Sequence, residues 1–221
     1  MMSSFTVPNL LSAEAVEELR SQLEAASWDD GRLTAGWYAK AVKQNQQLSK
    51  EETLTKVLEK QVRKAALSHP LFKVAARPRR LHTVRFNRYE NGMSYGRHTD
   101  DALMAGGRSD LSFTLFLSEP DSYEGGELVV EGLDSEQKYK LPAGSMIVYP
   151  SSRLHRVDAV TKGVRWAAVG WLESWVRSAE QRELLFELDT ARRSLYQKYG
   201  KTDEFDLITK SLSNLLRYWA E

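Results

Sequence analysis

The short motif His98-Thr99-Asp100 offers an imidazole and a carboxylate with one residue between them. In an extended segment, side chains two residues apart point to the same side of the chain, so both groups can face one point in space. A second imidazole would complete a set of two histidines and one carboxylate, which leaves adjacent positions of an octahedral metal open. This ligand set suits ferrous iron that binds an organic co-substrate together with O₂.

His155 is the candidate for the third ligand, because it lies in a segment that reads as a late strand. Of the other histidines, His82 lies on a predicted strand and His69 precedes a proline, and neither belongs to a ligand motif. A His-x-Asp motif alone is a weak signal, since most such motifs lie in surface turns, and His155 alone reads as an ordinary strand histidine. The combination predicts a metal site better than either part does.

Arg165 follows His155 by ten positions, beyond a turn at residues 161–163. If the flanking segments pair as a hairpin about Val160, Arg165 and His155 become near neighbours. Arg165 alternates with small and apolar residues such as Val169, so an inward-facing guanidinium would be a buried cation that needs an anion. A dicarboxylate ligand would provide that anion through a bidentate, charge-assisted pair.

The stretch from about residue 80 to 174, which carries these groups, shows no helical periodicity. Glycine pairs, Pro142 and Gly163 divide it into short β-rich runs. Many short strands without intervening helices favour an antiparallel sandwich or barrel. The expected strands cover residues 81–89, 111–117, 127–131, 144–149, 155–160 and 164–171.

The residues before this stretch read as helix, strand and helix. Ser12 is a cap for a first helix, and residues 37–42 read as a short strand. A second helix is expected to begin at a capping box formed by Ser49 and Glu52 and to end near Pro70. The first helix carries one apolar face, formed by Val16, Leu19 and Leu23.

After residue 174 the pattern returns to helix, with two apolar stripes separated near Gly200, which suits a helix C-terminus. Core packing is the simplest explanation of the stripes, and a homo-oligomer interface is the alternative. We therefore expect three regions: a supporting N-terminal region at 1–79, the site-bearing domain at 80–174 and a helical extension at 175–221. The two stripes consist of Leu184, Leu185, Leu188, Ala191 and Leu195, and of Phe205, Ile208, Leu212, Leu215, Leu216 and Trp219.

Composition excludes several other function classes. The 221 residues carry 31 Lys and Arg against 30 Asp and Glu, so a net charge of +1 gives no general attraction to nucleic acid or anionic membranes. The absence of cysteine excludes disulfides, thiolate metal sites and cysteine nucleophiles, and it fits a reducing compartment. No apolar run approaches bilayer length and the N-terminus lacks a signal-peptide pattern, so we expect a cytoplasmic protein without a membrane partner.

Three motifs mark the strand-rich stretch, and further motifs follow in the tail. The first three are Tyr89-Glu90-Asn91-Gly92 leading to Tyr95-Gly96-Arg97-His98-Thr99-Asp100, then Gly125-Gly126-Glu127-Leu128, then Gly144-Ser145-Met146-Ile147-Val148-Tyr149-Pro150-Ser151-Ser152 leading to His155. The tail has Trp175-Val176-Arg177, Leu184-Leu185-Phe186-Glu187-Leu188-Asp189 and Leu215-Leu216-Arg217-Tyr218-Trp219. Together they resemble the prolyl-4-hydroxylase branch of the 2-oxoglutarate/Fe(II)-dependent dioxygenases, and most closely the bacterial PKHD-type hydroxylases, over nearly the whole chain.

The resemblance implies a mainly β core with flanking helices: a double-stranded β-helix, or jelly roll, with N-terminal helices and a C-terminal helical extension. It also implies Fe²⁺ on His98, Asp100 and His155, 2-oxoglutarate with its distal carboxylate on Arg165, and ascorbate, which keeps iron ferrous. The implied reaction uses O₂ to hydroxylate an unactivated C–H bond, with succinate and CO₂ as co-products. The implied substrate is a peptide or protein side chain or a small metabolite.

The sequence departs from the resemblance at one position. Some prolyl-hydroxylase relatives place a co-substrate-binding tyrosine on the strand equivalent to residues 111–117, where this chain has Phe116, which lacks a hydroxyl. Tyr89 is the first candidate for the missing donor and Tyr149 the second. For each, the alternative is a tyrosine at the edge of the core.

Two other functions stay open from the sequence. A nucleic-acid dealkylase on the same scaffold usually carries a further arginine six residues beyond the co-substrate arginine. Here that position is Trp171, and the near-neutral charge also argues against nucleic acid as a partner. A non-catalytic jelly-roll binding module is the second alternative, and the complete ligand set with Arg165 argues against it.

Overall fold

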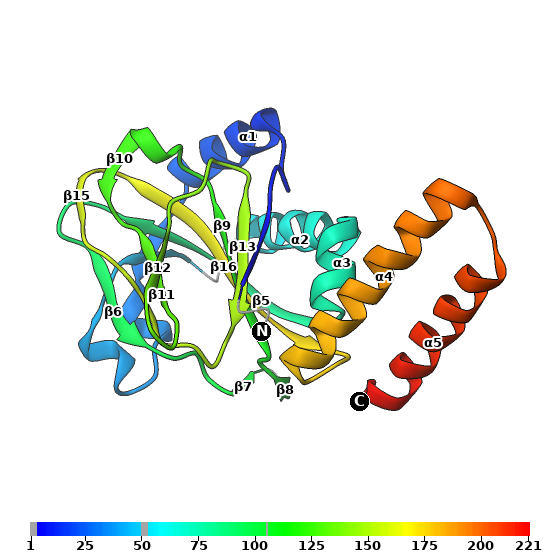
Figure 1. Cartoon of the computed structure of the whole chain (residues 1–221). Coiled ribbons are helices and arrows are strands. Elements are labelled where there is room, and N and C mark those ends of the chain that lie inside the picture. The colour runs from blue at the N-terminus through cyan, green and yellow to red at the C-terminus, as the bar shows by residue number, and fades with distance from the viewer. Residues whose placement is uncertain (1–3, 50–52, 105) are drawn as a thin grey trace.

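The computed structural model of the chain describes residues 4–49, 53–104 and 106–221. Two antiparallel sheets form the jelly roll at its centre (Figure 1). The larger sheet has the order β1 (Phe5–Val7), β13 (Met146–Pro150), β9 (Leu111–Phe116), β16 (Arg165–Ser174), β5 (Pro78–Tyr89), β4 (Gln46–Leu48) and β2 (Trp28–Asp30). The smaller sheet has the order β12 (Glu136–Tyr139), β11 (Leu128–Glu131), β14 (His155–Val157), β6 (Ser94–His98) and β3 (Lys43–Gln44).

Two short antiparallel pairs complete the strands. β10 (Tyr123–Gly125) pairs with β15 (Val160–Gly163), and β7 (Leu103–Met104) pairs with β8 (Gly107–Arg108). The described connections include the short 3₁₀ helices η1 (Gly31–Thr34), η2 (Ala39–Ala41) and η3 (Pro120–Ser122). The mainly β core expected from the sequence is therefore confirmed.

The larger sheet has two differently packed faces, because side chains alternate along each strand. On β16, Trp166, Ala168 and Leu172 pack into the main hydrophobic core on the helix side. On the same strand, Arg165 and Trp171 face the space between the two sheets. The sheet thus carries apolar packing on its outer face and polar site groups on its inner face.

Three helices cover the outer face of the larger sheet: α1 (Ala13–Glu24), α2 (Thr53–Ser68) and α3 (Pro70–Ala76) (Figure 1). Ser12 caps α1 as predicted, since its Oγ accepts a hydrogen bond from the Ala15 amide at 3.3 Å. The predicted apolar face of α1 is buried, and α2 ends just before Pro70. Glu52, a partner of the expected capping box, lies outside the described residues.

The C-terminal residues form a hairpin of two helices, α4 (Ala179–Tyr199) and α5 (Asp203–Trp219), which Figure 1 shows extending away from the jelly roll. Gly200 ends α4 with φ of 71°, a conformation that favours glycine. The hairpin has a small core of its own around Leu185 and Leu212, whereas Leu184 and Tyr218 are exposed. In the described part of the chain, none of the helices has the length and hydrophobicity that crossing a membrane requires.

Two local expectations from the sequence are wrong. Residues 37–42 contain the 3₁₀ helix η2 rather than a strand, and Trp37 is 87% exposed, so its apolar character does not reflect burial. The hairpin expected about Val160 does not form either, because β14 pairs with β11 and β6 while β16 pairs with β5 and β9. The expected strand at 155–160 ends at Val157, and Val160 begins β15.

A glycine on β16 allows the larger sheet to pack closely against a buried aromatic ring. A Cβ atom at Gly170 would lie 2.4 Å from Cζ of Phe113 and 3.0 Å from the carbonyl oxygen of Thr83. The ring of Phe113 is fully buried, so it has little room to move away.

We expect Gly170→Ala to lower the free energy of unfolding by about 1–3 kcal/mol, because overpacking a core has this typical cost. Urea denaturation followed by circular dichroism measures the change. Gly36→Ala is the matched control, since the nearest heavy atom to its added Cβ lies 4.0 Å away. Equal losses in the two variants would contradict the packing argument.

Candidate metal centre and co-substrate pocket

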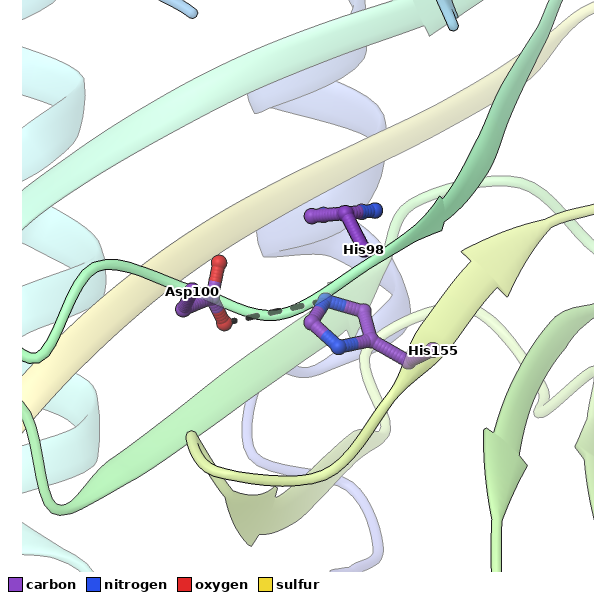
Figure 2. Close-up of side chains that lie close together, drawn as sticks. All are labelled: His98, Asp100 and His155. Atoms are coloured by element: carbon purple, nitrogen blue, oxygen red, sulfur yellow. Dashed lines mark ion pairs between the residues drawn. The ribbon is translucent and has the colours of Figure 1, made fainter. Parts of the chain in front are cut away.

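Two imidazoles and one carboxylate converge between the sheets, as Figure 2 shows. One ligand atom from each of His98, Asp100 and His155 lies within 4.8 Å of the other two. Oδ2 of Asp100 lies 3.6 Å from Nε2 of His155, and the ring centroids of the two histidines are 4.3 Å apart. The spacing and the donor types are those that a single transition-metal ion could bridge.

The pairing of β14 with β6 brings the two histidines together. His155, the first residue of β14, is registered directly opposite His98, the last residue of β6. Asp100 follows two residues after His98, where the chain leaves the sheet. Two features therefore bring the three side chains together: the short His98-Thr99-Asp100 motif, and a cross-strand pairing of His98 with His155, which lie 57 positions apart.

Backbone carbonyl groups orient both imidazoles. Nδ1 of His98 donates to the carbonyl oxygen of Gly96 at 2.8 Å, and Nδ1 of His155 donates to that of Arg153 at 3.0 Å. Because a carbonyl oxygen only accepts, each Nδ1 carries the proton and each Nε2 keeps its lone pair for a metal. Burial, with a further contribution from His155, lowers the pKa of His98 to about 4, which favours the neutral form that binds metals.

Asp100 is held by a buried group of three serines. The Ser112 hydroxyl donates to Oδ2 of Asp100 at 2.6 Å. Ser112 Oγ lies 2.8 Å from Ser151 Oγ, which accepts a hydrogen bond from the Ser109 hydroxyl at 3.0 Å. Ser112 thus fixes the carboxylate, and Ser151 and Ser109 hold Ser112 in turn, much as outer hydrogen bonds fix ligands in known metal sites.

Arg165 lies in the interior of the jelly roll with only 1% of its surface exposed. Within the described parts of the chain, its Nε and Nη2 atoms have no hydrogen-bond partner. Its guanidinium carbon lies 5.2 Å from the ring centre of Tyr89 and 5.3 Å from that of Phe116. A buried guanidinium with unpaired donors is costly unless an anion binds it, so this position fits the carboxylate of a ligand.

Both candidate tyrosines lie in the same interior, at different ends of the site. Tyr89 on β5 is registered directly opposite Arg165 on β16. The ring of Tyr149 instead packs edge-on against His155, with 5.1 Å between ring centres. Burial raises the pKa of Tyr89 and raises that of Tyr149 well above its usual value, so both phenols stay protonated and can donate a hydrogen bond.

A cavity of about 330 Å³ connects these groups, and its lining includes the three converging residues, Arg165 and both tyrosines. This volume is within the usual range for small-molecule sites. His155 and Arg165 share this cavity, although their strands belong to different sheets and do not pair. His82, in contrast, binds the carbonyl oxygen of Arg108 through Nε2 at 2.7 Å, outside this cavity.

Sequence reasoning did not identify two residues that contact the converging groups. Ser112 carries no local signal, because its contact with Asp100 depends on how β9 lies beside the loop after β6. Tyr95 stacks on His98 with 3.6 Å between ring centres and 18° between planes. Tyr95 lies within the motif that carries the resemblance, which was the available signal for it.

Comparisons with known proteins agree over almost the whole chain. A model of the 2OG-Fe(II) oxygenase superfamily matches residues 84–173, and one of the PKHD-type hydroxylase C-terminal domain matches residues 180–221. A PKHD-type hydroxylase from Picosynechococcus sp. is 59% identical over 98% of this chain and 99% of the relative. Another, from Synechococcus elongatus, is 56% identical over 98% and 99%.

A solved structure shares the fold of the jelly roll. It is a prolyl hydroxylase from Trichoplax adhaerens in complex with a hypoxia inducible factor peptide fragment. The TM-score is 0.60 at 13% identity, and the match covers 84% of this chain and 87% of that chain.

We expect Ser112→Ala to weaken metal binding by about 10- to 100-fold, because Asp100 loses the donor that fixes its carboxylate. Titrating the metal-free protein with Co²⁺ and following its visible absorption measures the affinity without turnover. Ser118→Ala is the matched control: its buried hydroxyl donates to the carbonyl of Val164 at 3.0 Å and accepts the Trp166 amide at 2.9 Å, outside the cavity. An unchanged Co²⁺ affinity in Ser112→Ala would exclude the positioning role.

Proposed function

The chain belongs to the PKHD-type hydroxylases of the 2OG-Fe(II) oxygenase superfamily, and we propose that it works through iron held by His98, Asp100 and His155. Arg165 then binds the distal carboxylate of 2-oxoglutarate. One observation carries this proposal: the three ligand atoms and the unpaired guanidinium of Arg165 share one cavity. Family membership makes the chain an enzyme, so the reading as a non-catalytic binding module no longer applies.

The residues present fit both groups. The two Nε2 atoms and one carboxylate are the donor set typical of non-haem ferrous oxygenases, which keep positions open for co-substrate and O₂. The unpaired Nε and Nη2 atoms of Arg165 match a planar carboxylate. Iron and 2-oxoglutarate, when bound, supply an oxidation by O₂ that hydroxylates an unactivated C–H bond and leaves succinate and CO₂.

The protein's own contribution is orientation and exclusion of water. The carbonyl bonds to Nδ1 of His98 and His155 keep both rings turned toward the centre, and Ser112 holds Asp100. Arg165 would hold the distal carboxylate of the co-substrate in the interior of the jelly roll. The closed packing of Phe116 against this guanidinium keeps water from competing for it.

Tyr89 is the better candidate for the missing tyrosine donor. It lies across the strand pair from Arg165, with its ring centre 5.2 Å from the guanidinium carbon, so it is the tyrosine beside the proposed carboxylate position. Tyr149 packs against His155 instead, so its position does not favour contact with the distal carboxylate.

The proposed substrate is a peptide or protein side chain or a small metabolite, and ascorbate is proposed to keep iron ferrous. The nucleic-acid dealkylase alternative has no observation in its favour. Trp171, which stands where such enzymes usually carry an additional arginine, lines the cavity with its indole ring. The C-terminal hairpin is proposed as a contact between copies of the chain, since Leu184 and Tyr218 leave apolar surface exposed on it.

We expect Arg165→Ala to weaken 2-oxoglutarate binding by at least about 30-fold while iron stays bound, because a buried partner of the carboxylate is lost. Anaerobic titration with Fe²⁺ and 2-oxoglutarate, followed by the charge-transfer absorption band, measures this affinity. His98→Ala is the comparison, since it should abolish iron retention itself. If Arg165→Ala kept the wild-type affinity for 2-oxoglutarate, Arg165 would have no part in binding it.

The two tyrosines can be separated by the same titration. We expect Tyr89→Phe to weaken 2-oxoglutarate binding by about 10-fold or more, because a hydrogen bond to a charged group is lost. Tyr149→Phe is the matched variant and should leave this affinity within about twofold. The reverse order of effects would assign the donor role to Tyr149.

A further inference from the structure

A second arginine faces the cavity besides Arg165. Along β5, four residues line the cavity, namely Thr83, Arg85, Asn87 and Tyr89, while Val84 and Phe86 between them belong to the main hydrophobic core. Arg85 is registered opposite Val169 on β16, four residues along the strand from the pair formed by Tyr89 and Arg165. Four residues of strand span roughly 13 Å, so the two guanidinium groups are rooted at separate places on one face.

The guanidinium of Arg85 has one hydrogen bond, but part of its donor capacity is unused. Its Nη1 donates to the carbonyl oxygen of Thr34 at 3.3 Å, and its carbon lies 5.4 Å from the ring centre of Trp171. Its Nε is buried and has no hydrogen-bond partner. Among the described residues, no carboxylate forms a direct ion pair with Arg85, so its Nε–H group is free to bind an anion.

The surroundings of Arg85 limit the anion it can bind. Burial is the main influence on Arg85 and lowers its pKa, while Tyr95 and the carboxylates of Asp101 and Asp100 act in the opposite direction. Lys43 lines the same cavity, but a dianion such as phosphate would be repelled by the two carboxylates more strongly than a monoanion. A single carboxylate fits better, because it matches the free edge of one planar guanidinium.

The position of Arg85 relates the bound anion to the reacting centre. Thr34, which holds Arg85, lies in a segment whose neighbours Leu33 and Trp37 are strongly exposed. This places Arg85 toward the open side of the cavity, with Arg165 in the interior. Leu103 and Met104 line the same cavity and offer an apolar contact.

We infer that Arg85, stacked on Trp171, forms a substrate subsite that binds a carboxylate carried by a largely apolar substrate. The inference rests on the proposed function and deepens it, because it names the substrate's chemical class. The bound carboxylate fixes one end of the substrate, and the remainder extends toward His98 and Asp100. Arg85 is then a residue that determines specificity, with a role separate from that of Arg165.

The competing explanation is structural. In that case Arg85 only ties β5 to the segment at Thr34 and packs on Trp171, and the anion is irrelevant. A purely structural role of this kind uses the Nη1 hydrogen bond to Thr34 and gives the Nε–H group no function. Whether the Nε–H group of Arg85 binds an anion therefore separates the two explanations.

The experiment follows the arginine Nε–H groups by ¹H–¹⁵N NMR of the whole chain, loaded with Zn²⁺ and saturating 2-oxoglutarate. The probes are phenylacetate and its neutral partner phenylacetamide, and Arg85→Lys assigns the Arg85 signal by its loss. We expect phenylacetate to shift the Arg85 signal saturably and phenylacetamide to leave it in place. An Arg85 signal that ignores phenylacetate, or follows both probes equally, overturns the inference.

Two variants test the affinity directly. Arg85→Gln should weaken phenylacetate binding by about 10-fold or more, as expected for losing a charge-assisted hydrogen bond. Arg88→Gln is the matched control, because Arg88 lies on the same strand with its guanidinium 5.3 Å from the Trp166 ring, outside the cavity. Equal affinities in Arg85→Gln and Arg88→Gln would also overturn the inference.

The same spectra separate this inference from the proposed function. The Arg165 Nε–H signal should shift when 2-oxoglutarate is added, before any phenylacetate. If it does and Arg85 then ignores phenylacetate, only the subsite is wrong. If 2-oxoglutarate shifts Arg85 and leaves Arg165 unmoved, the assigned roles of both arginines are wrong.

Discussion

The pairing of β14 with β6 is the constraint on which the site depends. It places His155 opposite His98, and Asp100 reaches the same point only because it leaves the sheet two residues later. A slip of one residue in this register would turn one imidazole to the other face of the sheet, since side chains alternate along a strand. The hydrogen bonds that the two Nδ1–H groups donate to the carbonyl oxygens of Gly96 and Arg153 then fix the rotation of the imidazole rings.

The site also requires both sheets. The smaller sheet supplies the histidines, and the larger sheet supplies Arg165, Tyr89 and, through β9, Ser112. The helices α1 to α3 act at a distance, because the apolar core beneath the larger sheet fixes the strands that carry the polar inner face. Substitutions in that core would therefore change the spacing between the histidines and Arg165 without touching either.

Features that depend on residues close together in the sequence were predictable, and features that depend on strand pairing were not. His98 and Asp100 are two residues apart, and His155 lies in a motif of its own, so spacing and resemblance were enough to bring them together. The hairpin expected between His155 and Arg165 failed, because short strands that follow one another in a jelly roll often join different sheets. The strand predicted at residues 37–42 failed for a different reason. An apolar residue indicates a strand only where its side chain is buried, and Trp37 is 87% exposed.

Two buried arginines show why unpaired polar atoms are informative about function. Arg182 is buried almost as completely as Arg165, but its Nη1 donates to the carbonyl oxygens of Val176 and Arg177 at 2.7 and 2.8 Å. The chain therefore satisfies a buried guanidinium with its own backbone where the role is structural. In the described chain, no backbone carbonyl group accepts a hydrogen bond from Nε or Nη2 of Arg165. Leaving these donors free costs stability in the ligand-free protein, and a fold tolerates that cost where an anion regularly occupies the site.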